Sequence, residues 1–145
     1  MANPLIPQGT LNRVLTSMIV SNFTDLNVTV SNMGKSFARL AFDSNFDEQI
    51  ETATGIVTSP EPYVMATVTV GILRTQPLAQ AWLAQSQVLS DIGPIALHSD
   101  TTTFGAIDLA DCVIRNVDPG AYDGLDPVTK LTIRGVFYIN NNLWS

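Results

Sequence analysis

Side chains able to carry chemistry are few in this sequence. His98 is the only histidine and Cys112 the only cysteine, so the zinc sites that such residues build together cannot form. No G-x-S-x-G nucleophile motif accompanies the histidine, and no glycine-rich phosphate-binding loop is present. We therefore expect His98 to be a structural or surface residue and Cys112 a small core residue. Catalytic residues, cofactors and enzymatic activity are not expected.

Three aspartates form the one candidate for a metal site. Asp118, Asp123 and Asp126 lie in a loop that contains proline and glycine, and oxygen ligands on a flexible loop suit calcium. However, the spacing of an EF-hand and its closing glutamate are missing. Asp-Pro and Asp-Gly pairs are also common turn chemistry. Turn formation is therefore the preferred interpretation, with calcium as the alternative and no metal expected.

A second acidic group occupies the stretch 43–61, which holds five of the thirteen acids and no basic residue. One interpretation is a solvated loop. The other is that Asp47, Glu48 and Glu51 face a channel or the rim between stacked rings, where like charge would keep a polyanion from adhering.

The composition favours an assembling protein. Charged residues make up 14% of the 145 residues, against about 25% in an ordinary domain. Much of the surface is thus expected to be covered by other subunits, although a polar, uncharged monomer remains the alternative. The net charge of −6 and the scattered arginines predict no specific nucleic-acid binding. No apolar stretch approaches the roughly 20 residues that span a bilayer, so no membrane partner is expected.

The pattern of residues predicts one mainly β domain over residues 1–145, with an arm at 1–9 and a tail at 140–145. The β-branched and apolar residues of Thr10–Val20 predict a strand, and so do the alternating apolar residues of Asp25–Ser31. A turn is expected at 32–35, and Phe37–Phe42 is a third strand candidate. A long hairpin is expected over about 49–73, with arms Gln49–Thr58 and Tyr63–Leu73. Its second arm has a small, uncharged face that we expect to meet another subunit, at Thr67, Thr69 and Gly71.

One helix is predicted at about 76–90, between a capping Thr75 and the pair Gly93-Pro94. Strands then follow at Ile95–His98, Phe104–Val117 and Val128–Ile139, the last with an irregularity at Gly135. The expected fold class is an antiparallel β-sandwich or partly closed barrel with one flanking α-helix.

The order of these segments resembles the tube proteins of contractile-tailed bacteriophages. The sequence VTVGILRTQPLAQAWL at Val68–Leu83 is similar to the junction at which a "VTV-x-[IL]-L-[KR]-T-x-P" strand end leads into a short helix. Thr101–Ile114 and Leu131–Phe137 are similar to the final strands of that family. The segment Leu26–Gly34 and the acidic stretch fit its first half. The resemblance covers most of the chain.

The resemblance implies a structural virion protein whose rings, usually hexamers, stack into the hollow inner tube of a contractile tail. Its implied partners are further copies of itself, the tail sheath protein, the tape measure protein and the genomic DNA that passes through the lumen. The implied location is the virion tail, after assembly in the host cytoplasm. Contacts between rings are expected from the arm and the tail, at Leu5, Ile6, Leu143 and Trp144.

Other members of the same structural class remain open. A tail terminator or a baseplate tube initiator would share the fold, and a type VI secretion tube protein would follow the same physics of assembly.

Overall fold

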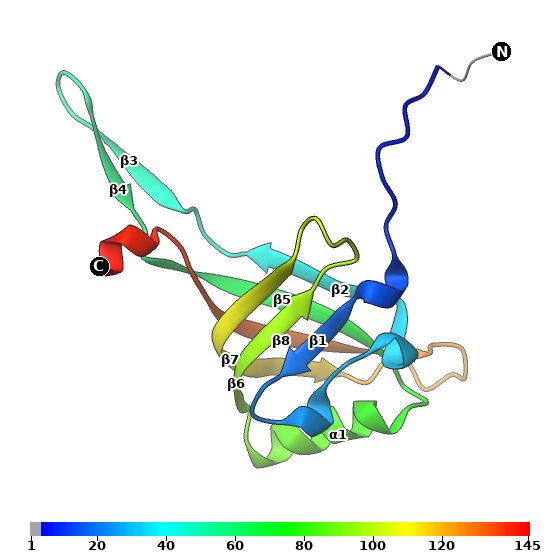
Figure 1. The fold of residues 1–145 in the computed structure, drawn as a ribbon. Coiled ribbons are helices and arrows are strands. Elements are labelled where there is room, and N and C mark those ends of the chain that lie inside the picture. Colours follow the sequence, from blue (N-terminus) through cyan, green and yellow to red (C-terminus); the bar gives the residue numbers. More distant parts are fainter. Residues whose placement is uncertain (1–3) are drawn as a thin grey trace.

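Six antiparallel strands form one curled sheet, in the order β1-β6-β7-β8-β5-β2, in the computed structural model, which describes residues 4–145 (Figure 1). A second, two-stranded sheet consists of β3 and β4. The strands are β1 (Ser17–Val20), β2 (Met33–Phe42), β3 (Asp47–Glu51), β4 (Ile56–Pro60), β5 (Tyr63–Leu73), β6 (Asp91–His98), β7 (Ala106–Asp118) and β8 (Val128–Tyr138). The helices are α1 (Pro77–Val88) and the 3-10 turns η1 (Arg13–Leu15), η2 (Thr24–Leu26), η3 (Val30–Asn32) and η4 (Asn141–Trp144). The mainly β class with one helix is confirmed, and the sheet curls as a half-barrel rather than a two-layer sandwich.

Strand alternation places the core inside the curl. Every second residue of β5 faces inward, and the side chains from Val64 to Ile72 on that face are at most 1% exposed. Leu131 and Ile133 of the neighbouring β8 continue the same surface. Helix α1 contributes the fully buried Trp82 to this cluster, so it covers part of the apolar inner face. The predicted helix at 76–90 is confirmed, but it ends at Val88, and the pair Gly93-Pro94 that was expected to close it lies in β6. Its N-cap is Gln76 rather than Thr75, with Pro77 at the first helical position, where a missing N–H does no harm.

The N-terminal half departs from the predicted strands. The strand expected over residues 10–20 is limited to β1 and follows the turn η1. The strand expected at 25–31 is wrong: η2 and η3 occupy it, and Val28 only forms a single bridge with Met18. The side chain of Asn27 accepts a hydrogen bond from the Val20 amide at 2.8 Å, so a side chain replaces a ladder partner. The turn expected at 32–35 is wrong as well, because β2 begins at Met33.

The long hairpin is present, with different arms and a different turn. β2 and β3 lead outward, and β4 and β5 return. The chain reverses at residues 52–55, where the Thr52 amide donates to the Gly55 carbonyl at 2.8 Å, and not at the proline-containing segment 58–62. Pro60 is the last residue of β4. Proline has no backbone N–H to donate, and it is tolerated here because β4 pairs with β3 alone among the described strands.

The irregularity expected at Gly135 lies in the strand opposite it. The register between β5 and β8 runs through Gly135 without a break, whereas β7 shifts between Ala110 and Val113. Asp111 sits at this shift with a φ of 49°. Gly135 is buried because the displaced β7 residues lie against it: a Cβ there would be 2.5 Å from Cys112 Sγ and 3.2 Å from Leu109 Cβ. Glycine is thus required for close packing.

Replacing Gly135 with alanine should lower the free energy of unfolding by about 1–3 kcal/mol, the usual cost of overpacking a core. Urea denaturation followed by fluorescence measures this change. The matched control is Gly55→Ala at the exposed hairpin turn, where the nearest atom would lie 3.9 Å away, and it should leave stability unchanged. Equal stability of the two variants would contradict the packing role assigned to Gly135.

Candidate assembly interface

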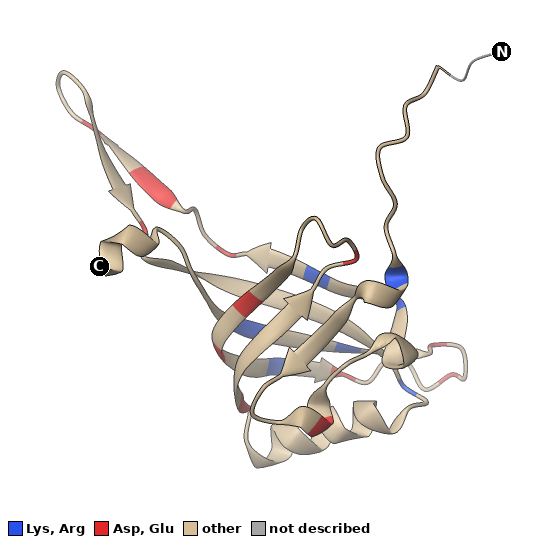
Figure 2. Cartoon of the chain, in the orientation of Figure 1, with Lys and Arg blue, Asp and Glu red and all other residues tan. Residues whose placement is uncertain are grey.

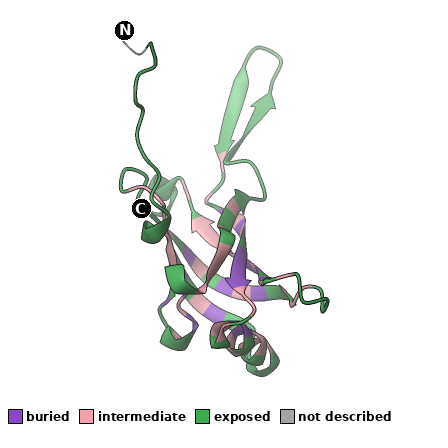
Figure 3. Ribbon diagram, turned by 90° about the vertical axis from the view of Figure 1, so that its right-hand side faces the viewer, coloured by how far each residue is buried: buried purple, intermediate pink, exposed green. Residues whose placement is uncertain are grey.

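The hairpin formed by β3 and β4 projects from the sheet and is exposed on both faces (Figures 1 and 3). We call residues 47–60 the projecting hairpin. Its strands pair only with each other within the part of the chain that the structure describes, and an isolated two-stranded hairpin is marginal in water. It nevertheless exposes large apolar side chains, with Ile50, Ile56 and Val57 at 48%, 62% and 53%. Such a segment is suited to contact another protein surface.

The pairing register divides the hairpin side chains between two faces. Asp47 and Glu51 lie on one face with Ile56, which pairs with Glu51. Glu48 lies on the other face beside Ile50, because successive residues of a strand point in opposite directions. The three acids predicted to act together therefore do not share one face. No ion pair holds any of them within residues 4–145, and they stand apart from the basic residues of the sheet (Figure 2).

Asp43, at the start of the acidic stretch, has partners on the sheet. Its carboxylate accepts a hydrogen bond from Arg134 Nε at 3.0 Å and contacts Thr67 Oγ1 at 3.0 Å. The exposed pair adds little stability, since water screens it. It does fix the position from which the chain leaves β2 towards the projecting hairpin.

The C-terminal segment fastens the base of the projecting hairpin. Asn140 Nδ2 donates to the carbonyl of Phe46 at 3.1 Å and to that of Glu61 at 2.8 Å, so one amide bridges the two chain segments that enter and leave the hairpin. Trp144 Nε1 donates to the Pro62 carbonyl at 3.3 Å and stacks edge-on against Tyr138. Asn140 has a φ of 50°, a left-handed conformation that asparagine tolerates better than most residues. The direction of the hairpin is therefore set by the end of the chain.

Sequence reasoning missed Asn140. The three consecutive asparagines at 140–142 were visible, and asparagine is enriched at left-handed positions. Nothing in the sequence indicated which backbone carbonyls such a residue would reach, because they lie 94 and 79 residues away along the chain.

The residues predicted for subunit contacts on β5 lie in the middle of the sheet. β5 is paired with β8 on one side and β2 on the other, so it has no edge to offer another strand. Thr69 is exposed on the outer face, Thr67 contacts Asp43, and Gly71 is buried, where a Cβ would meet the Ser36 carbonyl at 2.8 Å. A subunit contact at this site would have to use the outer face of the sheet.

The predicted contact residues of the arm and the tail are exposed. Leu5 and Ile6 are 76% and 78% exposed, and Leu143 and Trp144 are 51% and 61% exposed. The first two lie outside any helix or strand, and residues 1–3 of the predicted arm lie outside the described residues. The last two form η4 beside the projecting hairpin.

The single thiol is confirmed as a core residue. Cys112 is fully buried, and this burial raises the pKa of its thiol to about 11, although a backbone hydrogen bond at Ile95 opposes the shift. Little thiolate, the nucleophilic form, is present at neutral pH. His98 lies at the end of β6, beside the turn into β7.

The aspartate loop is held by turn hydrogen bonds. Asp118 accepts from the Gly120 amide at 3.0 Å and Asp123 from the Leu125 amide at 2.9 Å. Asp126 accepts from two backbone amides, those of residues 121 and 128, and these bonds hold the pKa of its carboxyl below its usual value. Each carboxylate thus has a local backbone partner, as turn chemistry predicts. Among residues 4–145, no group of three or more His, Cys, Asp or Glu side chains is placed to hold a metal ion.

Comparisons with known proteins found little. No family model matches the chain, and no curated protein matches it. Among solved structures, the chain is similar to one from the cap of an anti-feeding prophage, described as its tube terminating cap. The two chains share 11% sequence identity with a TM-score of 0.48, over 94% of this chain and 97% of the other. Similarity at that level does not establish a common function. None of the helices described is long and apolar enough to cross a membrane.

Replacing Asn140 with glycine should loosen the base of the projecting hairpin while preserving the backbone conformation. The variant loses two hydrogen bonds, each worth about 0.5–1.5 kcal/mol, and glycine accepts a positive φ without strain. Hydrogen exchange at the Glu61 amide, which donates to the Phe46 carbonyl, should become several-fold faster, with little change in the exchange of β5 and β8.

The control for this experiment is Asn141→Gly, one residue further along. The Asn141 side chain makes no hydrogen bond within residues 4–145. Exchange at Glu61 that is equally fast in both variants, or unchanged in Asn140→Gly, would refute the role assigned to Asn140.

Proposed function

We propose that this chain is a structural subunit of a contractile phage-type tail, and that its rings stack into the inner tube. The observation that carries the proposal is the projecting hairpin, an exposed two-stranded element with large apolar side chains. Within residues 4–145 its strands pair only with each other. A hairpin of this kind gains stability when neighbouring copies supply the missing contacts. A ring of copies would satisfy those contacts around a closed circle.

The open sheet supports the same proposal. The sheet order ends at β1 on one side and at β2 on the other. The outer side of β1 is partly covered by the Met18–Val28 bridge and by the Asn27 side chain, whereas β2 pairs with β5 alone among the strands of residues 4–145. Unpaired strand edges are templates for pairing between chains. A closed ring removes such edges, and stacking through different surfaces of the same subunit extends the ring into a tube. The hexameric number rests on the family resemblance alone.

The segment that carries this resemblance has a defined structural task. Val68–Leu83 forms the end of β5, the connection to α1 and the first half of that helix. Arg74, at the connection, donates to the carbonyls of Pro119 and Ala121 at 3.1 and 2.5 Å, and lies 5.3 Å from the centre of the Tyr122 ring. The junction therefore holds the loop between β7 and β8 in place. These hydrogen bonds give a physical reason for the arginine or lysine that the strand-to-helix pattern has at the position of Arg74.

The proposed partners follow from the tail architecture. They are neighbouring copies of the same chain, the sheath protein outside the tube, and the tape measure protein and DNA within it, all located in the virion tail. The function is mechanical rather than catalytic. A tail terminator or baseplate tube initiator would use the same surfaces, but its rings would not propagate on their own. Growth of the purified chain into tubes of many rings separates these alternatives.

The purified chain at high concentration should form rings or hollow tubes in negative-stain electron micrographs. The double variant Ile50→Ser/Val57→Ser removes a directly opposed apolar pair from one face of the projecting hairpin. It should remain folded, because that pair is exposed, and fail to assemble. The control, Val88→Ser, removes a side chain that is 83% exposed at the end of α1 and should assemble normally. Normal rings from the double variant would refute a hairpin-mediated assembly.

Neutralising the hairpin acids tests whether they face the lumen. We expect Asp47→Asn and Glu51→Gln together, which change the two acids that share one face of the hairpin, to leave tubes intact and to reduce DNA passage, since an uncharged wall no longer repels the polyanion. Genome ejection from assembled particles is the measurement. The control replaces two exposed aspartates of the main domain with asparagine, at positions 25 and 108. Lost assembly, or unchanged ejection, would contradict the lumen assignment.

A further inference from the structure

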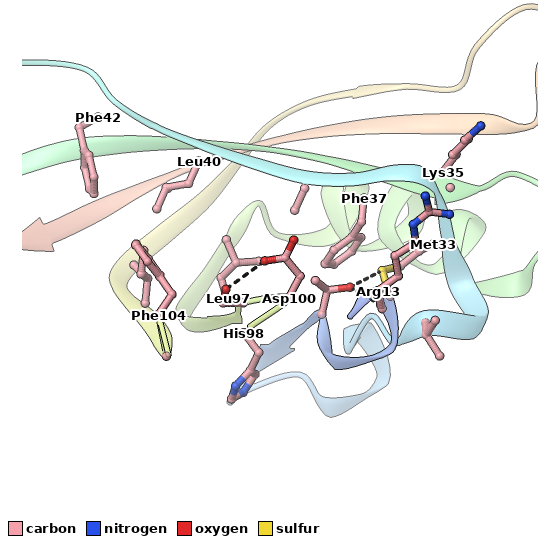
Figure 4. A pocket seen from close by; sticks show the side chains of 17 residues that line it. Arg13, Met33, Lys35, Phe37, Leu40, Phe42, Leu97, His98, Asp100 and Phe104 are labelled. Atoms are coloured by element: carbon pink, nitrogen blue, oxygen red, sulfur yellow. Dashed lines mark hydrogen bonds between the residues drawn. The ribbon is translucent and has the colours of Figure 1, made fainter. Parts of the chain in front are cut away.

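The curled sheet leaves an apolar groove on its open side. The groove has a volume of about 670 Å³ and lies between β2 and the turn that joins β6 to β7 (Figure 4). Its apolar lining comes from both sides: Phe37 and Leu40 from β2, and Leu97, Phe104 and Ile107 from the opposite wall. This volume falls within the range of about 300–1,000 Å³ that holds a specific ligand.

One wall of the groove is the terminal strand of the sheet. β2 pairs with β5 on one side and is the last strand in the sheet order. An extended segment that entered the groove could therefore hydrogen-bond to β2 along its open edge while its apolar side chains contacted the lining. Arg13, Lys35 and Asp100 also line the groove. The open edge and the apolar part of the lining thus favour an extended peptide with apolar side chains over a compact ligand.

A segment of that description is present in the same chain. Residues 4–12, which we call the arm, have neither helix nor strand, carry no charge, and extend away from the body (Figure 1). Ile6 and Leu11 are 78% and 69% exposed. Pro4 and Pro7 restrict the backbone to extended conformations, which lowers the entropy lost when the arm binds.

The arm starts at the rim of the groove and leads away from it. The Asn12 amide donates to the Asp100 carbonyl at 2.8 Å, and Arg13, Thr16 and Asp100 all line the groove. Residues 4–11 can reach roughly 26 Å when extended, at about 3.3 Å per residue. The arm is thus directed towards another molecule rather than into its own groove.

We propose that the arm of one copy binds in the groove of a second copy. Arm and groove are different surfaces, so the contact is heterologous, and each copy both donates an arm and receives one. Such a contact propagates from copy to copy without exhausting either surface. The inference rests on the self-association proposed above, but it does not require the projecting hairpin or the formation of rings.

Engineered cysteines test the contact between separate chains. One protein carries Ile6→Cys in the arm and the other carries Ala38→Cys, an exposed residue that lines the groove. Cys112 does not interfere because it is buried. After mixing and mild oxidation, the expected result is a disulfide-linked heterodimer, several-fold more abundant than the homodimers of either protein alone. Non-reducing electrophoresis and mass spectrometry measure it.

Two controls define the result. Thr69→Cys lies on the outer face of the same sheet and should not link to Ile6→Cys. Adding Leu11→Asp to the arm should reduce heterodimer yield several-fold without unfolding the protein, since Leu11 is exposed. A heterodimer yield equal to that of the Thr69 control overturns the proposal.

The remaining outcomes separate this inference from the proposed function. A double variant, Ile6→Cys/Ala38→Cys, that links within one chain at high dilution, with no heterodimer in the mixture, shows that the arm fills its own groove and overturns the inference. Rings in micrographs without the specific heterodimer would refute the arm contact and leave the tube proposal standing. The heterodimer without any rings would support the arm contact and refute the tube proposal.

Discussion

Unpaired backbone groups at strand edges are the constraint on which this architecture depends. A sheet of six strands that curls without closing retains two terminal strands, β1 and β2, and the projecting hairpin adds edges of its own. In water the backbone groups of such edges are solvated, but they pair readily with a strand of another chain. Natural proteins either block this pairing or use it for assembly. Here the edge at β2 borders an apolar groove and the hairpin exposes isoleucine and valine. Lys35 and Arg39 of β2 and Pro60 of β4 are residue types that hinder such pairing. The exposed apolar surface beside these edges nevertheless favours use over protection.

The position of these edges is set by few contacts, and most are long-range. The hairpin is held at its base by one amide side chain, Asn140, by the indole of Trp144, and by ring contacts in which Phe42 meets Phe46 and Phe137 at 5.3 and 5.0 Å. At the other end of β5, Arg74 ties the helix connection to the loop after β7. The sheet thus carries two projecting elements, the hairpin and the loop after β7, and each is tied by side chains from distant parts of the chain. These elements are therefore oriented without being buried.

The local sequence pattern was enough to predict the fold class and those helices and strands whose observed pairing agrees with that pattern. The strand β5 and the three C-terminal strands follow from the period of the apolar residues, and the start of the helix follows from Pro77, although neither of its predicted caps was correct. The wrong predictions of strands and turns share one physical cause. The residues with which a segment pairs are distant in sequence, so its own sequence does not identify them. Leu26 and Val28 are buried as their alternation indicates, yet the Asn27 side chain and two 3-10 turns take the place of a ladder. The reversal at 52–55 was missed because two prolines nearby carried a stronger turn signal. The groove, and the bridge made by Asn140, depend on segments far apart in sequence and could not be predicted from either segment alone.

The distribution of exposed apolar residues bears on whether the low charge content reflects assembly or merely a polar monomer. A polar monomer would scatter its exposed apolar side chains over the whole surface. In this structure most of them lie on segments that project from the sheet or border it: the arm and η1, the hairpin and its base, the turn with Phe104, the loop with Tyr122 and Leu125, and the end of α1. Ile19 of β1 and Val30 of η3 are exceptions. The outer face of the sheet, by contrast, carries Arg39, Thr69, Lys130 and Thr132. The chain thus has a well-solvated face and several apolar projections, which together favour contacts made through extended segments over contacts made through a flat surface.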